Sequence, residues 1–384
     1  MTTDPDPVAI AIARLQARFA DFVQHAAQDD PLYAALAAAV STHPDWAALL
    51  AAAPAPQQLP MLWLAALQDR LLERVDAGDR PPLAEYYASV GGIRAPDDAL
   101  VAKLGEFIAG NRAELLACIA TGSTQTNEIG RCAVLWPTLQ SLVEATGTPR
   151  LALLDVGCSA GLNLGVDRWR YRYVDDASGA TVAATRGREP RAPEITCRLL
   201  AGGRDAFVRS AAEPDIASRS GIDLKPVAVD DARAVRWLRA CLWPHDTERR
   251  RRFDAAVAIA RTQHWPLRAV TDAAAAVVDW LDDLPAGLTP VVFNSWVLSY
   301  FDAPLLRRHV ESLLDLVARR GVVWISAEDP RLSRGFWPGK PASSADGRPN
   351  ATSWTLARPD GRGGVAWSLA ATSHAHGRWM LCEG

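Results

Sequence analysis

A continuous apolar run, LALLDV (151–156), constrains the fold of this chain more than any other stretch. A strand that is apolar at nearly every position is typical of a parallel strand buried on both faces of a sheet. Parallel neighbours need long crossover connections, usually helices, so strands and helices should alternate along the chain. The run ends at Asp155, and Gly157 and Gly161 follow, which predicts a strand, a tight turn and then a helix.

The rest of the chain supports this alternation. Later strand-like runs are SGIDL (220–224), LRAV (267–270), TPVVFN (289–294) and GVVWIS (321–326). Helical periodicity separates them, at about 231–242, 247–260, 273–284 and 303–319. Three last runs predict antiparallel strands: SWTLA (353–357), VAWSLAA (365–371) and GRWMLCE (377–383). We therefore predict an α/β fold, a Rossmann-like, doubly wound, mostly parallel sheet with antiparallel C-terminal strands.

Two domains are predicted. Residues 1–120 contain short helical patterns separated by Gly and Pro, which indicates an N-terminal all-α cap or lid domain. Residues 121–384 carry the sheet, with a β-hairpin insertion near 170–200. In that insertion RYRYVDDASGATVAA (170–184) predicts a hairpin with one wet face rather than a buried parallel strand. Helices are expected at 8–24, 59–75, 81–90, 96–109, 112–120 and about 128–145.

Composition excludes several classes of protein. The 41 basic and 44 acidic residues give a net charge of −3, so no nucleic-acid partner is expected. The N-terminus lacks a signal-peptide pattern, and no apolar run reaches the roughly 18 residues of a membrane span. The six cysteines are scattered and the histidines show no metal-ligand spacing, so we expect reduced thiols, no metal, no membrane association and a cytoplasmic location. The oligomeric state stays open.

The turn after the first strand has the composition of a ligand site. Its candidate cofactor-binding residues are Asp155, Gly157, Ser159, Gly161 and Asn163. The pattern differs from the dinucleotide fingerprint G-x-G-x-x-G, and an acid at Asp155 would repel a diphosphate. It would suit a ligand that carries an ammonium or a sulfonium, such as S-adenosylmethionine. The alternative is a strand–turn–helix corner without a ligand.

Other polar residues close the later strands. A nucleotide ligand needs a second acid for its ribose hydroxyls, and Asp223 at the end of SGIDL competes for this role with Asp175 and Asp176. Asp272 is either a helix N-cap or an acid on the base side of the ligand. The strand TPVVFN ends in Asn294, Ser295 and Trp296 at the point where a substrate would lie, although a simple cap explains them too.

A polar stretch, TGSTQTNEIGRC (121–132), precedes the first strand. Helix capping accounts for one or two of its side chains. Because the stretch is dense in amides and hydroxyls, we predict that it forms a second wall of the site. The residues of this wall are Ser123, Gln125, Thr126, Asn127, Glu128 and Arg131, and Glu128 and Asn294 are the catalytic candidates.

Several separated motifs resemble one known family. They are STQTNEIGR (123–131), LLDVGCSAGLNLGVDRWRYRY (153–173), GIDLKP (221–226), WLRACLWP (237–244) and VVFNSWVLSYF (291–301). Together they are similar to the DUF2332 family of uncharacterised bacterial proteins, over about residues 80–384, a family usually placed near the S-adenosylmethionine-dependent methyltransferase fold.

The resemblance implies a methyltransferase-type domain at 121–384. Asp155, Gly157 and Gly161 would then correspond to the first cofactor motif, Asp223 to the ribose-binding acid and Asp272 to the adenine-side acid. Ser159 replaces the usual glycine of those enzymes.

Three functions are compatible with these features. The first is a class I-like, S-adenosylmethionine-dependent methyltransferase that acts on an unidentified small molecule. The second is a non-catalytic protein that binds or senses a nucleoside or adenosyl ligand. The third is an NAD(P)-dependent oxidoreductase, which Asp155 and the missing fingerprint disfavour.

Overall fold

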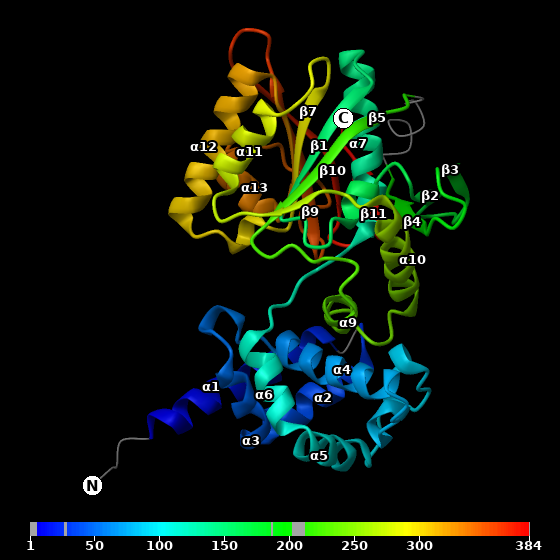
Figure 1. The fold of residues 1–384 in the computed structure, drawn as a ribbon, viewed down its shortest axis with the longest axis vertical. Coiled ribbons are helices and arrows are strands. Elements are labelled where there is room, and N and C mark those ends of the chain that lie inside the picture. Colours follow the sequence, from blue (N-terminus) through cyan, green and yellow to red (C-terminus); the bar gives the residue numbers. More distant parts are fainter. Residues whose placement is uncertain (1–5, 27–28, 186, 202–211, 384) are drawn as a thin grey trace. The chain divides into compact units, whose positions relative to one another are not determined.

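A computed structural model of the chain describes residues 6–26, 29–185, 187–201 and 212–383. The chain divides into two compact units (Figure 1). One unit is helical and combines Met1–Thr126 with Asp230–Arg251. The other contains the sheet and combines Asn127–Val229 with Arg252–Gly384. The expected fold class, an α/β protein with a mixed sheet and N-terminal helices, is confirmed.

Among its described residues, the helical unit contains six α-helices of the N-terminal segment and one from later in the chain. They are α1 (Pro7–Ala26), α2 (Pro31–Thr42), α3 (Pro44–Ala47), α4 (Pro60–Asp76), α5 (Leu100–Gly110), α6 (Arg112–Thr121) and α9 (Ala232–Ala240). Short 3-10 helices connect them: η1 (Ala48–Ala52), η2 (Ala55–Gln57), η3 (Pro82–Tyr86) and η4 (Ala88–Val90). The helix predicted at 81–90 is therefore two 3-10 turns, separated by the extended backbone of Tyr87.

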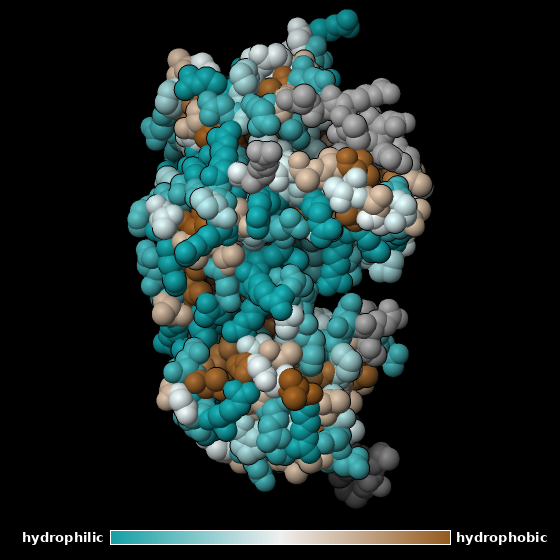
Figure 2. Space-filling model, turned by 90° about the vertical axis from the view of Figure 1, so that its right-hand side faces the viewer, coloured by the Kyte–Doolittle hydropathy of each residue, from teal (hydrophilic) through white to brown (hydrophobic). Residues whose placement is uncertain are grey.

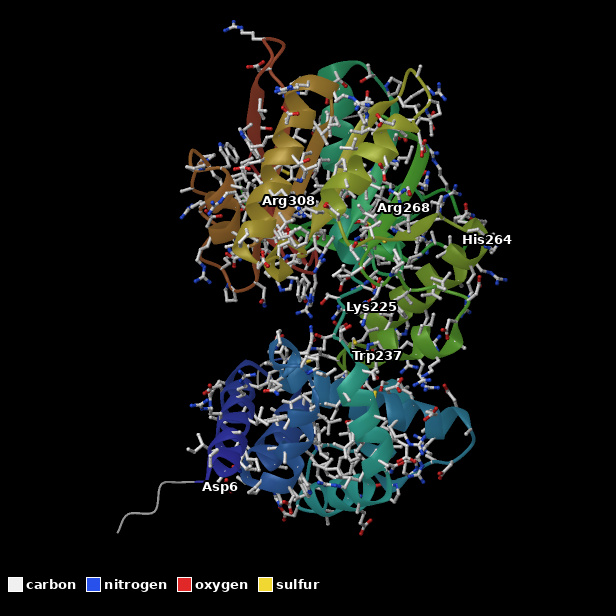
Figure 3. The ribbon with its side chains drawn as sticks, turned by 60° about the vertical axis from the view of Figure 1, so that its left-hand side comes forward. Asp6, Lys225, Trp237, His264, Arg268 and Arg308 are labelled. Carbon is white, nitrogen blue, oxygen red and sulfur yellow. The ribbon has the colours of Figure 1, made fainter. Side chains whose placement is uncertain are left out.

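Helix α9 belongs to the helical unit, although in sequence it follows the strand-like run SGIDL (220–224). The buried Gln68 side chain on α4 donates to the carbonyl oxygens of Ala240 (3.3 Å) and Leu242 (2.8 Å). Arg236 on α9 pairs with Asp69 and Glu73 of α4, each at 3.0 Å (Figure 3 shows the neighbouring Trp237). The sequence predicted this helix but not its packing, because the partners are far apart in the chain.

The described residues of the sheet unit form eleven strands in the order β3-β2-β4-β11-β10-β9-β8-β7-β1-β5-β6. Their bounds are β1 (Arg150–Val156), β2 (Arg170–Asp175), β3 (Thr181–Ala184), β4 (Glu194–Leu199), β5 (Asp215–Asp223), β6 (Leu267–Ala269), β7 (Thr289–Ser295), β8 (Val323–Glu328), β9 (Ala351–Pro359), β10 (Val365–His374) and β11 (Trp379–Cys382). The run β6-β5-β1-β7-β8 is parallel throughout, and β8-β9-β10-β11 is antiparallel.

Helices lie on both faces of the sheet (Figure 1). On one face are α11 (Ala273–Asp282), α12 (Ala303–Arg320) and α13 (Pro330–Phe336), and on the other is α7 (Cys132–Thr146), which contacts β4 and β10. A further helix, α10 (Thr247–Gln263), has its first turn in the helical unit. Ala152, Leu154 and Val156 of β1 pack into the core formed with α11 and α12. Because side chains alternate along a strand, Asp155 points to the opposite face.

The insertion near 170–200 differs from the expectation. β2 and β3 form the predicted antiparallel hairpin, but β2 also pairs in parallel with β4, which pairs in parallel with β11. Tyr171 and Tyr173 are buried, while Arg170 is exposed. The prediction that this segment is not a parallel strand was wrong, because the alternation marks one buried face and does not report the direction of the neighbouring strand.

No helix in the described ranges is both long and apolar enough to cross a bilayer. Figure 2 shows a mostly hydrophilic face with hydrophobic residues in small, separate patches. Large hydrophobic side chains that are exposed are Val8, Ile10, Leu59, Ile93, Val101, Leu224 and Tyr300.

Pro137 interrupts the hydrogen bonding inside α7. A proline lacks an N–H group, so the carbonyl of residue i−4, Ala133, loses its donor within the helix. The Tyr173 hydroxyl of β2 donates to this carbonyl at 2.9 Å. The phenol of Tyr173 thus compensates for the proline and attaches α7 to the inserted strands.

Tyr173→Phe is expected to lower the free energy of unfolding by about 1–3 kcal/mol, because it leaves a buried carbonyl without a donor. Urea denaturation monitored by fluorescence measures the change. The control is the same substitution in a Pro137→Ala background, where the helix regains its own N–H donor at position 137. An equal cost in both backgrounds would contradict this explanation.

Candidate functional site

The carboxyl end of β1 lies at a topological switch point. After β1 the chain forms β2, β3 and β4 at the far end of the sheet, then adds β5 and β6 on one side of β1 and returns to form β7 on its other side. In open α/β sheets, ligands bind where strand connections leave in opposite directions. Val156 pairs with Asn294 in the register of β1 and β7, and Val156 pairs with Ile222 of β5, next to Asp223. The strand-end residues singled out in the sequence therefore meet at one edge.

The turn after β1 has the backbone that its glycines predict. Gly157 (φ +77°) and Gly161 (φ +67°) are left-handed, and Ser159 between them is also left-handed (φ +50°). A Cβ on Gly157 would lie 2.4 Å from Cγ2 of Val297, so only glycine fits there. Asn127 Nδ2 donates to Ser159 Oγ at 2.7 Å, which holds a conformation that a serine rarely adopts.

The prediction of a helix after this turn was wrong. Gly161 is followed by η6 (Leu162–Gly165), a 3-10 helix of four residues, and the chain then turns into β2. A Cβ on Gly165 would lie 2.3 Å from the Trp169 ring, so the chain here packs tightly against the tryptophan that precedes β2. The turn consequently lacks the α-helix N-terminus that commonly binds phosphate groups.

Asp155 is the central acid of the site. It is 2% exposed, and its Oδ2 has no hydrogen-bond partner among the described residues. Burial and the nearby Asp223 carboxylate raise the pKa of Asp155 to about 8, against the opposing effects of Arg131 and of a hydrogen bond from Asn163. A buried carboxyl with an unused oxygen is rare in proteins and indicates a missing partner, which a ligand or water supplies.

Asp223 lies beside the glycine turn. Its Oδ2 accepts a hydrogen bond from the Ser159 N–H (2.9 Å) and its Oδ1 accepts one from the Lys225 N–H (2.8 Å), in the loop after β5 (Figure 3). The competing acids have other partners: Asp175 accepts from the Ser178 N–H and hydroxyl within the hairpin, and Asp176 pairs with Arg198 at 3.5 Å. Of the three acids, Asp223 is the one that these contacts connect to the turn.

The polar stretch is divided between the two units. Glu128 and Arg131 belong to the sheet unit with Asn127. Glu128 Oε1 caps the 3-10 helix η5 (Ile129–Arg131) by accepting from the Gly130 N–H at 2.7 Å. The buried Arg131 guanidinium donates to the carbonyl oxygens of Ala375 (2.8 Å) and Ser295 (3.2 Å), so it connects this wall to the end of β7.

Ser123, Gln125 and Thr126 belong to the helical unit. There the Ser123 carbonyl accepts a hydrogen bond from the Trp237 ring nitrogen at 2.9 Å. Their place in the wall of the ligand site stays a prediction.

Asn294 is completely buried and its amide is engaged within the protein. Its Oδ1 accepts from Trp324 Nε1 at 2.6 Å, and its Nδ2 donates to Ser326 Oγ (3.0 Å) and to Glu328 Oε1 (2.8 Å). This geometry suits a residue that positions Glu328 rather than one that contacts a substrate.

Glu328, at the end of β8, is a site residue that the sequence reasoning missed. Its Oε1 accepts hydrogen bonds from Asn294, from the Val297 N–H (3.0 Å) and from the Leu298 N–H (3.2 Å). Burial raises the pKa of Glu328 to about 7, despite these bonds and the charge of Arg131. The sequence contains a pattern that indicates this residue, since SAED (326–329) ends a predicted parallel strand with two acidic residues.

Buried polar atoms continue across the neighbouring strands. Glu328 pairs in register with Ser353 of β9, and Ser353 pairs with Thr372 of β10. Glu328 Oε2, Ser353 Oγ and Thr372 Oγ1 are all buried and have no hydrogen-bond partner in the part of the chain that the structure describes. Because native proteins seldom leave such groups unsatisfied, we expect water or the polar end of a ligand to bind along this row.

Ser295 and Trp296 follow the end of β7. Ser295 Oγ is buried and lacks a partner within the described ranges. Trp296 is left-handed (φ +54°), and its ring nitrogen donates to Thr352 Oγ1 at 2.9 Å. Left-handed non-glycine residues thus stand at the ends of both β1 and β7, and backbone strain of this kind concentrates at functional sites.

Asp272 acts as a helix cap in this structure. One carboxylate oxygen accepts from the Ala275 N–H at 3.1 Å, at the start of α11, and the other pairs with Arg308 of α12 at 3.2 Å (Figure 3). These contacts explain the residue without a ligand, and its adenine-side role stays a prediction.

The fold and this edge define a Rossmann-like α/β protein with a candidate ligand site at the switch point of its sheet. The chain belongs to the family described as "Uncharacterized protein conserved in bacteria (DUF2332)", whose profile matches residues 16–381. No curated protein matches it. A solved structure that resembles it is the sugar N-methyltransferase KedS8 from Streptoalloteichus sp., with 13% identity, a TM-score of 0.21, and coverage of 72% of this chain and 80% of that one. At such low similarity, the functional argument depends on the site itself.

Proposed function

We propose that the edge at β1, β5 and β7 binds S-adenosylmethionine and that the protein is a methyltransferase acting on a small molecule. The observation that carries the proposal is the Asp155 carboxyl, buried at the end of β1 with Oδ2 unused, beside a glycine turn whose Ser159 N–H binds Asp223. An ammonium group of the ligand would satisfy Asp155 and stabilise its ionised form.

The same contacts disfavour a diphosphate. Asp155 and Asp223 place two acids at the turn, and no α-helix begins after Gly161 to offer its N–H groups. Val297 occupies the space beside Gly157 through which the backbone of a dinucleotide site would approach a pyrophosphate. These features argue against an NAD(P)-dependent oxidoreductase.

The chain's own residues would bind the cofactor and hold it in position. Asp155 would bind the amino group of the ligand, and Asp223 has further lone pairs for ribose hydroxyls. Glu328 fixes the backbone of Val297 and Leu298 after β7, next to the turn and to the expected acceptor position. Bound S-adenosylmethionine would supply the methyl group, and alignment of the acceptor with its sulfonium would provide much of the rate acceleration. A hydroxyl or protonated amine acceptor also requires a base, for which Glu128 remains the candidate.

Calorimetric titration of the purified chain tests this proposal. S-Adenosylmethionine and S-adenosylhomocysteine are expected to bind, NAD(P) is expected not to bind, and Asp155→Ala should weaken both adenosyl ligands at least tenfold. Asp302→Ala, at an exposed helix cap, is the matched control. No binding of either adenosyl ligand would overturn the proposal. Binding without formation of S-adenosylhomocysteine from any of a panel of acceptors would favour a sensor over an enzyme.

A further inference from the structure

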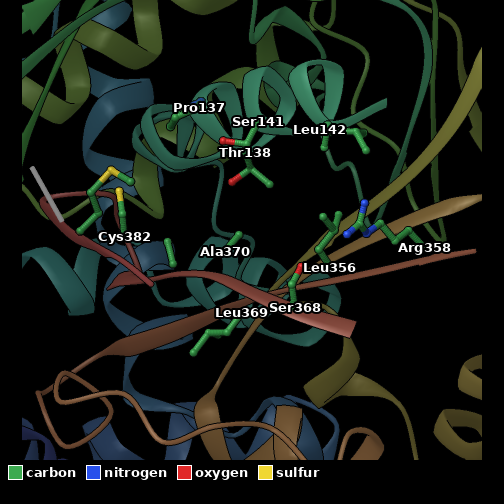
Figure 4. Close-up of a pocket in the computed structure, with 13 residues that line it drawn as sticks. Pro137, Thr138, Ser141, Leu142, Leu356, Arg358, Ser368, Leu369, Ala370 and Cys382 are labelled. Carbon is green, nitrogen blue, oxygen red and sulfur yellow. The ribbon is translucent and has the colours of Figure 1, made fainter. Parts of the chain in front are cut away.

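We propose that the sheet unit carries a second binding site, for a small amphipathic carboxylate, in a cavity between α7 and the strands β9, β10 and β11 (Figure 4). The cavity has a volume of about 220 Å³ and shares no lining residue with the site at the strand ends. Its walls include Thr138, Ser141 and Leu142 of α7 and Leu356, Leu369 and Met380 of the strands.

A β-bulge in β10 shapes the floor of the cavity. The register between β9 and β10 shifts between Leu369 and Ala371, which leaves Ala370 as the extra residue. As a result, all of 368–371 line the cavity, whereas a regular strand would offer every second residue. Bulges re-aim side chains and are common next to functional sites.

The walls are mainly apolar. Leu142, Leu356, Leu369 and Met380 are all at least nine-tenths buried. Ser141 and the facing strand residue Ser368 add hydroxyl groups. An apolar cavity of about 150 Å³ holds a benzene molecule, so this cavity has room for an apolar tail of about eight carbon atoms.

The charge at the two ends of the cavity differs. Figure 4 shows the Arg358 guanidinium near Leu142 at one end and Cys382 at the other. Arg358 is exposed, and although its backbone belongs to β9, its guanidinium makes neither an ion pair nor a hydrogen bond with any described residue. Burial, together with the adjacent Glu383, raises the pKa of the Cys382 thiol to about 12, so that end offers a neutral thiol beside a carboxylate. An anionic head therefore fits only at Arg358, with the apolar tail toward Cys382.

Octanoate, 1-octanol and octylamine are the probes, titrated calorimetrically into the full chain. Octanoate is expected to bind at least tenfold more tightly than octylamine. Arg358→Gln should weaken octanoate at least tenfold and leave 1-octanol unchanged, while Arg362→Gln, in the exposed turn after β9, serves as the matched control. Ser141→Trp, at an exposed position, should block the cavity for octanoate and 1-octanol alike.

Binding of octanoate should persist in Asp155→Ala, which separates this site from the one at the strand ends. No octanoate binding to the wild-type chain would overturn the inference. So would octanoate binding that neither Arg358→Gln nor Ser141→Trp changes, or octylamine binding as tight as octanoate binding.

Discussion

Glu328→Ala is expected to lower the free energy of unfolding by about 3–5 kcal/mol, because it removes a buried acceptor that three buried or partly buried donors share. Those donors are the Asn294 amide and the N–H groups of Val297 and Leu298. No described side chain is placed to replace the Glu328 oxygen, since the Asn294 amide is already engaged with Ser326 and Trp324. Denaturant unfolding at pH 6 measures the change.

Glu328→Gln is the matched control, since its side-chain oxygen can accept the same hydrogen bonds in the same volume. It should cost at most about a third of the alanine substitution. Because the loop after β7 depends on Glu328, the alanine variant should also weaken binding of S-adenosylhomocysteine. Equal stability of the wild-type, alanine and glutamine proteins would contradict the assigned role.

Asp155→Asn is expected to stabilise the protein at alkaline pH. Burial and Asp223 raise the pKa of Asp155 from 3.8 to about 8 in the folded state. A carboxyl with a raised folded pKa contributes its full stabilisation only below its unfolded pKa, near 3.8, and this stabilisation is lost progressively as the pH rises from there to about 8. Asparagine carries no charge, so the stability of the variant should not decline in this way. At pH 9 its free energy of unfolding should exceed that of the wild type by on the order of a few kcal/mol.

Thermal or urea unfolding of both proteins from pH 5 to pH 9 tests this difference. The stability of the wild type relative to the variant should fall steadily from pH 5 to about pH 8 and then level off, because over this range Asp155 is neutral in the folded protein but ionised in the unfolded chain. Asp302→Asn, which retains a good helix cap, should follow the wild type across the range. A stability difference between wild type and Asp155→Asn that does not change with pH would show that Asp155 is not held neutral by its surroundings.

Periodicity and turn chemistry predicted most of the parallel sheet. LALLDV is β1, and Gly157 and Gly161 are left-handed as the turn requires. Such features are local, since one buried strand and two glycines determine them. The antiparallel strands after residue 350 were predicted for the same reason, from alternation and turn residues.

The missed features depend on distant contacts. β2 and β4 pair in parallel through residues far apart in sequence, and alternation in RYRYV cannot report which strand lies beside it. Glu328 was missed because its importance comes from burial and from donors on another strand. The helix expected after Gly161 failed because Trp169 packs against Gly165, a contact that no local pattern encodes.

A crystal structure of the chain with S-adenosylhomocysteine tests the central claim most directly. The account predicts ligand density at the carboxyl ends of β1 and β5. The ligand's amino group should lie within hydrogen-bond distance of Asp155 Oδ2, and its ribose hydroxyls should contact Asp223. Density at another place in the chain, or crystals grown at saturating ligand in which this edge binds only water, would contradict it.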